Sequence, residues 1–135
     1  MKKLVLGLGF ALFCLVSCGD DDAAPAVNLD NLQKRWYNVS TIFAGATVPY
    51  DGHESCGKDY TEFLANNAMK EVDVVDCQSD ADVYEGTYSI ADDKLTTAVA
   101  GETLVYTIQK LNASSLELKT TFNGAEIVYV YTSTP

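Results

Sequence analysis

The sequence has a single histidine, His53, and few basic side chains. Nine lysines and arginines stand against nineteen aspartates and glutamates, a formal net charge of −10. A chain this acidic is repelled by nucleic-acid phosphates, which excludes nucleic acid as a partner. A nucleophile–histidine–acid triad would have to use His53, and the nearest nucleophile, Cys56, is a cysteine expected to be oxidised. There is also no glycine-rich phosphate loop, so we expect a protein that is not an enzyme and binds no cofactor.

A hydrophobic run long enough to cross a membrane is also missing. The longest apolar stretch, from Leu4 to Val16, has 13 residues. As a helix it spans about 20 Å, whereas a bilayer core needs about 30 Å. With Lys2 and Lys3 before it, the stretch has the layout of a secretory signal, which we assign to residues 1–17.

The end of this segment, Leu15-Val16-Ser17-Cys18, resembles the lipobox of bacterial lipoproteins. The resemblance implies that the Cys18 sulfur receives a diacylglycerol group, that a peptidase cuts before Cys18, and that the new amino group is acylated, for example by palmitate. Two or three acyl chains anchor a protein stably to a membrane. Residues 18–27 are then an acylated acidic tether. An ordinary cleaved signal is the alternative.

The acidic run Asp20–Asp22 directly follows the acceptor cysteine. As a solvated stretch it suits a tether. It also resembles the acidic run that lipoproteins of the Bacteroidetes carry after their cysteine, where it directs export to the outer face of the outer membrane. We therefore expect a lipid-anchored protein of the outer membrane, displayed on the cell surface, with a periplasm-facing anchor as the alternative.

Two cysteines remain in the mature chain, Cys56 and Cys77. An even pair in an exported protein predicts a disulfide. A metal site formed by both thiols and His53 is one alternative, and a pair of free thiols is another. No second Cys-x-x-Cys or His-x-x-His pair supports metal binding, so no metal site is assigned. Only a fragment of a calcium loop is present, at Asp80–Asp82.

The chain after residue 28 shows no sustained helical periodicity. Residues 28–34 can form one helical turn, with Leu29 and Leu32 facing inward. Beyond it, runs rich in tyrosine, threonine and valine predict eight strands separated by short turns, of which Asn123-Gly124 is the strongest. The expected strands are Arg35–Phe43, Asp59–Leu64, Met69–Val75, Tyr84–Ala91, Lys94–Val99, Glu102–Lys110, Ser115–Phe122 and Ala125–Ser133.

Apolar and polar residues alternate along these strands, as in Leu116-Glu117-Leu118-Lys119. Alternation gives each strand one apolar and one wet face, and the short connections require antiparallel neighbours. Residues 28–135 therefore predict an all-β domain, a small antiparallel up-and-down barrel of about eight strands with a short N-terminal helical turn. A two-sheet sandwich is the alternative architecture.

The pattern resembles the lipocalin-like domains of Bacteroidetes lipoproteins over residues 29–133. Lys34 stands where lipocalins commonly have glycine. The matching features are Leu32 with Trp36, Cys56 before Tyr60-Thr61-Glu62-Phe63, Cys77, Gly86-Thr87-Tyr88-Ser89-Ile90, Lys94-Leu95-Thr96, and Thr107-Ile108-Gln109-Lys110-Leu111 before Leu116-Glu117-Leu118. The resemblance implies a cup that binds a small hydrophobic ligand.

Aromatic side chains are the candidate lining of this cup, since tyrosine combines apolar area with a polar tip. The candidates are Trp36, Tyr84, Tyr88, Tyr106, Tyr129 and Tyr131. Two other functions stay open. The domain can be a structural or protein-interaction subunit of a surface complex, or an inhibitor of secreted enzymes that uses the loop from Pro49 to Cys56.

Overall fold

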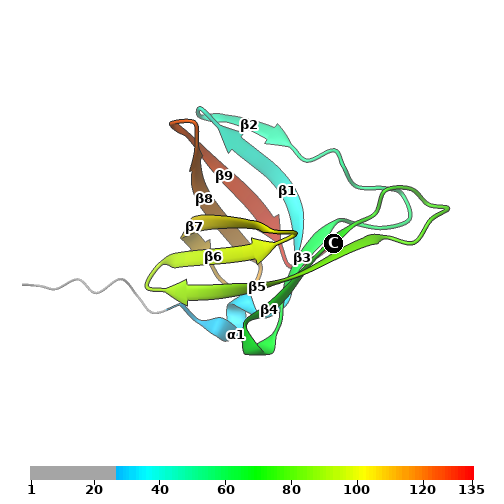
Figure 1. Cartoon of the computed structure of the whole chain (residues 1–135). Coiled ribbons are helices and arrows are strands. Elements are labelled where there is room, and N and C mark those ends of the chain that lie inside the picture. Colours follow the sequence, from blue (N-terminus) through cyan, green and yellow to red (C-terminus); the bar gives the residue numbers. More distant parts are fainter. Residues whose placement is uncertain (1–26) are drawn as a thin grey trace, which may run out of the picture.

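A computed structural model of the chain describes residues 27–135. The predicted signal segment, Cys18 and the tether as far as residue 26 lie outside the described residues. The described part forms one helical turn, a short 3-10 turn and nine strands (Figure 1). In chain order these are α1 (Leu29–Leu32), β1 (Arg35–Phe43), β2 (Ala46–Pro49), β3 (Tyr60–Phe63), η1 (Ala65–Asn67), β4 (Ala68–Asp73), β5 (Asp82–Ala91), β6 (Lys94–Val99), β7 (Glu102–Leu111), β8 (Ser115–Phe122) and β9 (Ala125–Thr132).

The strands form one continuous antiparallel sheet in the order β2-β1-β3-β4-β5-β6-β7-β8-β9. An additional pairing of β1 with β9 closes it, so β1 and β3 to β9 make a closed barrel of eight strands. The predicted barrel is confirmed, and closure excludes the two-sheet sandwich. Closing the sheet removes the open edges that a sandwich would leave.

Strand β1 changes partner halfway along its length. Residues Arg35 to Tyr37 pair with β3, whereas Ser40 to Phe43 pair with β2. Because β2 pairs only with β1, the wall opens between β1 and β3 beyond Tyr37 (Figure 1). We call this half of the barrel the open end, and the half that carries α1 the closed end. The sequence did not predict β2, because it is only four residues long, fully exposed and ends in proline.

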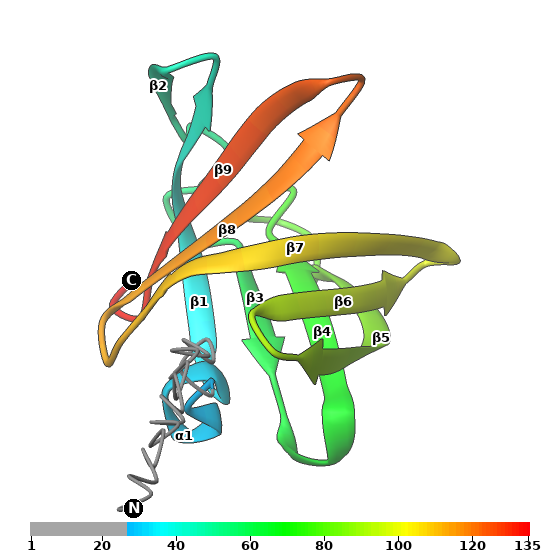
Figure 2. The ribbon, with the colours of Figure 1, turned by 90° about the vertical axis from the view of Figure 1, so that its left-hand side faces the viewer.

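Helical turn α1 covers the closed end (Figure 2). Asn28 caps it by accepting a hydrogen bond from the Asp30 amide at 3.0 Å. Leu32 and Trp36 are fully buried beneath the turn, and the Trp36 indole donates to the Leu32 carbonyl at 2.9 Å. The core at this end consists of Leu32, Trp36, Phe63, Met69, Tyr88, Leu95, Leu116 and Leu118.

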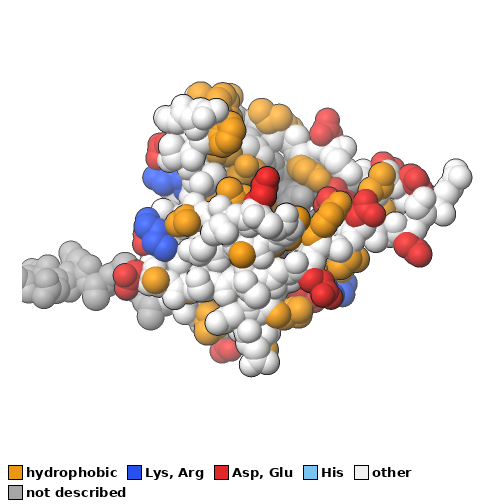
Figure 3. Space-filling view, in the orientation of Figure 1, with side chains coloured by type: hydrophobic (Ala, Val, Ile, Leu, Met, Phe, Trp, Pro, Cys, Tyr) orange, Lys and Arg blue, Asp and Glu red, His pale blue; other side chains and the backbone are white. Residues whose placement is uncertain are grey.

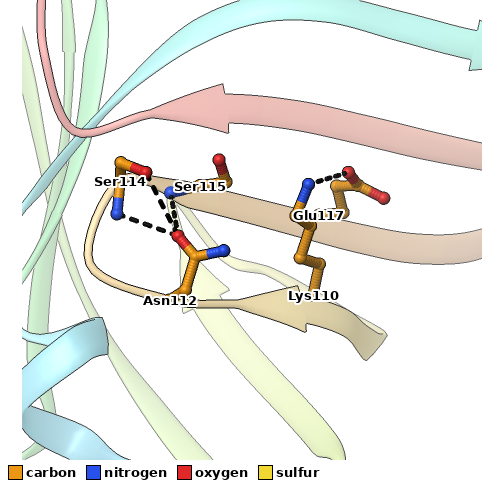
Figure 4. Close-up of polar contacts among 5 residues, drawn as sticks. All are labelled: Lys110, Asn112, Ser114, Ser115 and Glu117. Carbon is orange, nitrogen blue, oxygen red and sulfur yellow. Dashed lines mark hydrogen bonds and ion pairs between the residues drawn. The ribbon is translucent and has the colours of Figure 1, made fainter.

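The turn between β7 and β8 lies at the same end and is fixed by one side chain. Asn112 Oδ1 accepts hydrogen bonds from the amides of Ser114 and Ser115, at 3.0 and 2.9 Å (Figure 4). Lys110 and Glu117 pair across the two strands at 3.5 Å. Lys34 reaches the carbonyl of Ala113 in this turn. Helix α1 and the turn therefore join in one packed floor.

The open end carries the β8–β9 hairpin. Asn123 and Gly124 take φ angles of 49° and 81°, as the Asn-Gly prediction requires. Here the apolar face of the strands is left partly uncovered, with Phe122 64% and Leu104 46% exposed. Within residues 27–135, no helix has the length and apolar character needed to cross a bilayer.

Candidate functional site

The open end of the barrel encloses two hollows. The first has a volume of about 200 Å³, lies at the gap between β1 and β3, and is lined by Asn38, Ser40, Thr41, Tyr50, Tyr60, Thr61, Glu71, Asp73, Tyr129, Val130 and Tyr131. The second has about 240 Å³ and is lined by Glu71, Asp73, Tyr84, Thr97, Val99, Ala100, Glu102 and Leu104. Because both walls contain Glu71 and Asp73, we treat the hollows as one cup.

The register of the sheet brings Glu71 into the cup. Cross-strand pairing aligns Glu71 with Thr61 on one side and with Tyr84 on the other. Met69, two residues earlier on β4, is only 2% exposed and belongs to the core. Side chains two apart on a strand share a face, so Met69, Glu71 and Asp73 all face inward. Glu71 stands just above the packed floor, and Asp73 lies at the mouth.

The surroundings of these two carboxyl groups disfavour their ionised form. Burial raises the pKa of Glu71 above its ordinary value, and the neighbouring charge of Asp73 raises it further. The pKa of Asp73 is raised by burial first and then by Asp59 and Asp82. No ion pair of Glu71 occurs within residues 27–135, in contrast with Glu62 on the outer face, which pairs with Arg35 and Lys70. The cup is therefore an uncompensated acidic environment.

Three tyrosines from β7 and β9 form the aromatic wall opposite. Tyr106 and Tyr129 meet edge to face, with ring centroids 6.1 Å apart. Burial, followed by the proximity of Tyr129 and Glu71, raises the pKa of Tyr106 to about 12. Burial, followed by Tyr106 and Glu71, raises that of Tyr131 as well. The hydroxyls of Tyr106 and Tyr131 stay protonated at neutral pH and can donate hydrogen bonds to a bound molecule.

A loop between β2 and β3 forms one side of the mouth and is held by a polar network. The Tyr50 hydroxyl donates to Asp59, which also accepts the Val74 amide at 2.8 Å. His53 Nδ1 accepts the Asp59 amide, and Nε2 donates to the Asn38 carbonyl at 2.8 Å. Burial raises the pKa of Tyr50 to about 12, with a further contribution from its bond to Asp59. The loop is thereby fastened to β1 and to Val74, directly after β4.

The disulfide predicted between Cys56 and Cys77 is confirmed, with Cα atoms 5.6 Å apart. It ties this loop to the β4–β5 connection. The alternative metal site is wrong, because both thiols are consumed and both His53 ring nitrogens are hydrogen-bonded. No group of three or more metal-ligating side chains is found in the part of the chain that the structure describes.

The aromatic residues predicted to bind ligand fall into two groups. Tyr84, Tyr129 and Tyr131 line the cup, and Tyr106 lines a small extension of about 20 Å³ at its base, together with Glu71. Trp36 and Tyr88 instead lie in the closed-end core, at 0% and 4% exposure. They are absent from the walls of the hollows because α1 and the β3–β4 turn cover them.

Sequence reasoning missed the polar side chains of the cup, among them Glu71, Asp73 and Thr97. Within Met69-Lys70-Glu71-Val72-Asp73, neither face is purely apolar, so alternation alone does not orient the strand. The orientation of this strand follows from its register with β5. That register sets Met69 opposite Gly86 and hence Glu71 opposite Tyr84. Thr97 was not predicted as a cup residue because threonine occurs on both the inner and the outer face of a strand.

Comparison with known proteins identifies the fold. A family model described as a lipocalin-like domain matches residues 32–118. A lipocalin-like protein from Bacteroides uniformis superposes with a TM-score of 0.56 at 13% identity, covering 73% of this chain and 96% of its own. An uncharacterized protein from Bacteroides eggerthii gives a TM-score of 0.59 at 10% identity, covering 76% and 98%. No curated protein matches the chain.

Proposed function

Because the chain belongs to the lipocalin-like domain family, we propose that it is a non-catalytic binding protein that holds a small hydrophobic molecule in its cup. The observation that carries this proposal is the division of the barrel into a packed floor and a hollow, aromatic upper half. Each hollow alone, at about 200 and 240 Å³, is smaller than the roughly 300–1,000 Å³ of drug-sized sites, so a molecule held in one of them is compact.

The shape of the cup supports a binding role. Tyrosine side chains form its wall, and a small extension lined by Tyr106 and Glu71 lies at its base. Such a space with aromatic sides is suited to enclosing a molecule.

A lipid anchor at Cys18 is the second part of the proposal. Residue 27 leads directly into α1 at the closed end, so an anchored chain holds the barrel by its floor and leaves the mouth free (Figure 2). We propose attachment to the outer membrane with display on the cell surface, and a periplasm-facing anchor as the alternative. Metabolic palmitate labelling tests the anchor: label is expected in the parent and lost in Cys18→Ala. Protease treatment of intact cells distinguishes the two faces.

Ligand binding is tested with an uncharged hydrophobic fluorophore, N-phenyl-1-naphthylamine. We expect saturable enhancement with the parent and loss of it in Thr41→Phe, which fills the first hollow opposite Tyr129. The matched control is Thr121→Phe, which adds the same ring on the outer face opposite Glu126. Equal binding by both variants would contradict a ligand site in the cup. Circular dichroism verifies that each variant is folded.

A protein-interaction role remains the second candidate, favoured by exposed apolar side chains at the open-end tips. Phe43 is 49%, Val48 56% and Phe122 64% exposed. Apolar groups gathered at one end of a domain are typical of a contact surface. Native mass spectrometry of protein purified from its own host separates the candidates. A bound small-molecule mass supports the cup, and a protein partner with an empty cup supports the interaction role.

A further inference from the structure

Charge is distributed unequally between the inside and the outside of the barrel. None of the residues that line the two hollows is basic, whereas Glu71, Asp73 and Glu102 are acidic. Five basic side chains form ion pairs with carboxylates elsewhere: Arg35 and Lys70 with Glu62, Lys94 with Asp93, Lys110 with Glu117, and Lys119 with Glu126. On the face seen in Figure 3, red acidic side chains are more frequent than blue basic ones. Within the described residues, the carboxylates of the cup are left without a basic partner.

A second observation points to a missing polar partner. Thr97 is only 7% exposed, yet its side chain lies in the walls of both the second hollow and the extension beneath it. Its hydroxyl makes no hydrogen bond within residues 27–135. A hydroxyl on a residue as buried as Thr97 normally has a hydrogen-bond partner, and this one borders the hollow, where a bound molecule can supply it. Thr97 and Glu71 therefore present unpaired polar atoms to the same space.

The two features call for a particular ligand chemistry. A cation beside Glu71 would offset the burial and the repulsion by Asp73 that disfavour its charge, whereas an anion would add to the repulsion. The rings of Tyr106, Tyr129 and Tyr131 can contact an ammonium group by cation–π attraction and can pack against an aryl group. A cation with an apolar body can contact Glu71 with its charge and the tyrosine wall with its apolar part.

We propose that the cup selects a small organic cation, of the arylalkyl-ammonium type, over neutral or anionic molecules of the same shape. In this arrangement Glu71 faces the ammonium group, Thr97 lies beside it, and the tyrosine wall receives the aryl group. The inference rests on the proposed binding function and deepens it. No group of three metal-ligating side chains exists among residues 27–135, which favours an organic cation over a bare metal ion.

The test compares three probes that share one skeleton: phenethylamine, 2-phenylethanol and 3-phenylpropionate. Calorimetric titration at pH 7, where the amine is protonated, should rank the cation tightest, by about tenfold or more over the alcohol, with the anion weakest. Equal affinity for all three, or preference for the anion, overturns the inference.

The matched variants are Glu71→Gln and Glu85→Gln. Glu85 is exposed on the outer face of the neighbouring strand, opposite Lys70, so its replacement removes the same charge from outside the cup. Glu71→Gln should lose the preference for the amine by about tenfold and keep the affinity for the alcohol, while Glu85→Gln should behave as the parent. A Glu71→Gln protein that is folded and still prefers the amine contradicts the assignment.

Failure of this inference is distinguishable from failure of the proposed function. If N-phenyl-1-naphthylamine binds in the cup and the three probes show no charge preference, the binding function stands and the cation selectivity is wrong. If neither the fluorophore nor any probe binds, both are wrong.

Discussion

The two ends of the barrel use aromatic side chains in opposite ways. At the closed end, the Trp36 indole donates to Leu32, and the Tyr88 hydroxyl donates to the Leu64 carbonyl and accepts from Gln33, each at about 3 Å. At the open end, Tyr106, Tyr129 and Tyr131 are only partly buried and surround a hollow. The same residue type therefore builds stability at one end and leaves a surface for recognition at the other.

The difference follows from where the barrel is covered. Helix α1 and the β3–β4 turn place partners above the closed-end rings, so every polar tip is satisfied. The departure of β1 from β3 removes the corresponding cover at the open end. Buried rings whose polar atoms have hydrogen-bond partners stabilise a fold. Tyrosine hydroxyls and carboxylates without partners reduce stability, and they are retained where a ligand can bind them.

The largest contrast is expected when a ring is removed from each end. Trp36→Ala should lower the free energy of unfolding by about 3–5 kcal/mol, because it leaves a large cavity in a fully buried site. Tyr129→Ala should cost less than half as much, since its ring already borders a hollow. Urea denaturation measures both, and equal losses would show that the open end is packed as tightly as the floor.

Removal of the disulfide should rank next. The double variant Cys56→Ser/Cys77→Ser should lose about 3 kcal/mol, from the chain entropy of a loop closed over a separation of 21 residues. Because the bond joins open-end loops, Trp36 emission in the folded state should match the parent. A loss below about 1 kcal/mol, measured by urea denaturation, would mean that the polar network around Asp59 holds the loops by itself.

Single hydroxyl deletions sharpen the comparison. Tyr88→Phe should cost about 1–2 kcal/mol, because the Leu64 carbonyl and the Gln33 amide both lose their partner. Tyr131→Phe should change stability by no more than about 0.5 kcal/mol, since its hydroxyl makes no hydrogen bond within the described residues. Thermal unfolding of the two variants is the measurement. A larger loss for Tyr131→Phe would reverse the proposed division of roles.

The smallest effect is a pH dependence. The pKa of Glu71 is higher in the folded protein than its ordinary value of 4.5. A proton on Glu71 therefore stabilises the fold fully below that value, and this contribution is lost as the pH rises through the raised pKa. Glu71→Gln, which cannot titrate, should gain in melting temperature relative to the parent between pH 4 and pH 7.

The titratable groups that border Glu71 in this pH series are Asp73 on its own strand, Tyr84 on β5, Glu102 and Tyr106 on β7, and Tyr131 on β9. The charge of Asp73 acts on Glu71 directly, and its replacement in Glu71→Gln/Asp73→Asn should reduce the remaining dependence. A constant difference in melting temperature between Glu71→Gln and the parent across this range would show that burial does not act on the Glu71 charge.

The sequence was sufficient for most of the barrel wall. Alternation and turn chemistry predicted Lys94–Val99 and Ser115–Phe122 with the observed bounds. Export context predicted the disulfide, because spacing alone does not pair cysteines. The site was harder. A carboxylate becomes part of the cup only through cross-strand register, and register is a tertiary property that Met69 and Gly86 establish together.

The aromatic residues show the same limit. Alternation placed Tyr88 on an inward face, and composition made Tyr131 a candidate for the cup lining. Neither signal says which end of a strand is covered by other elements. The partner change along β1 depends on β2, a short exposed strand whose sequence carries little signal. The sequence therefore identified aromatic candidates for the barrel interior, but it did not show which of them lie in the packed floor and which line the cup.

The most direct test of a cup at the open end is fluorine NMR of protein labelled with 3-fluorotyrosine, titrated with phenethylamine. The eight tyrosines sample the cup, the floor and the outer face of one barrel. The account predicts that the resonances of Tyr106, Tyr129 and Tyr131 shift with a common affinity, while those of Tyr88 in the floor and Tyr37 outside stay in place. Shifts confined to Tyr37 or Tyr88, with the cup tyrosines unmoved at saturation, would contradict it.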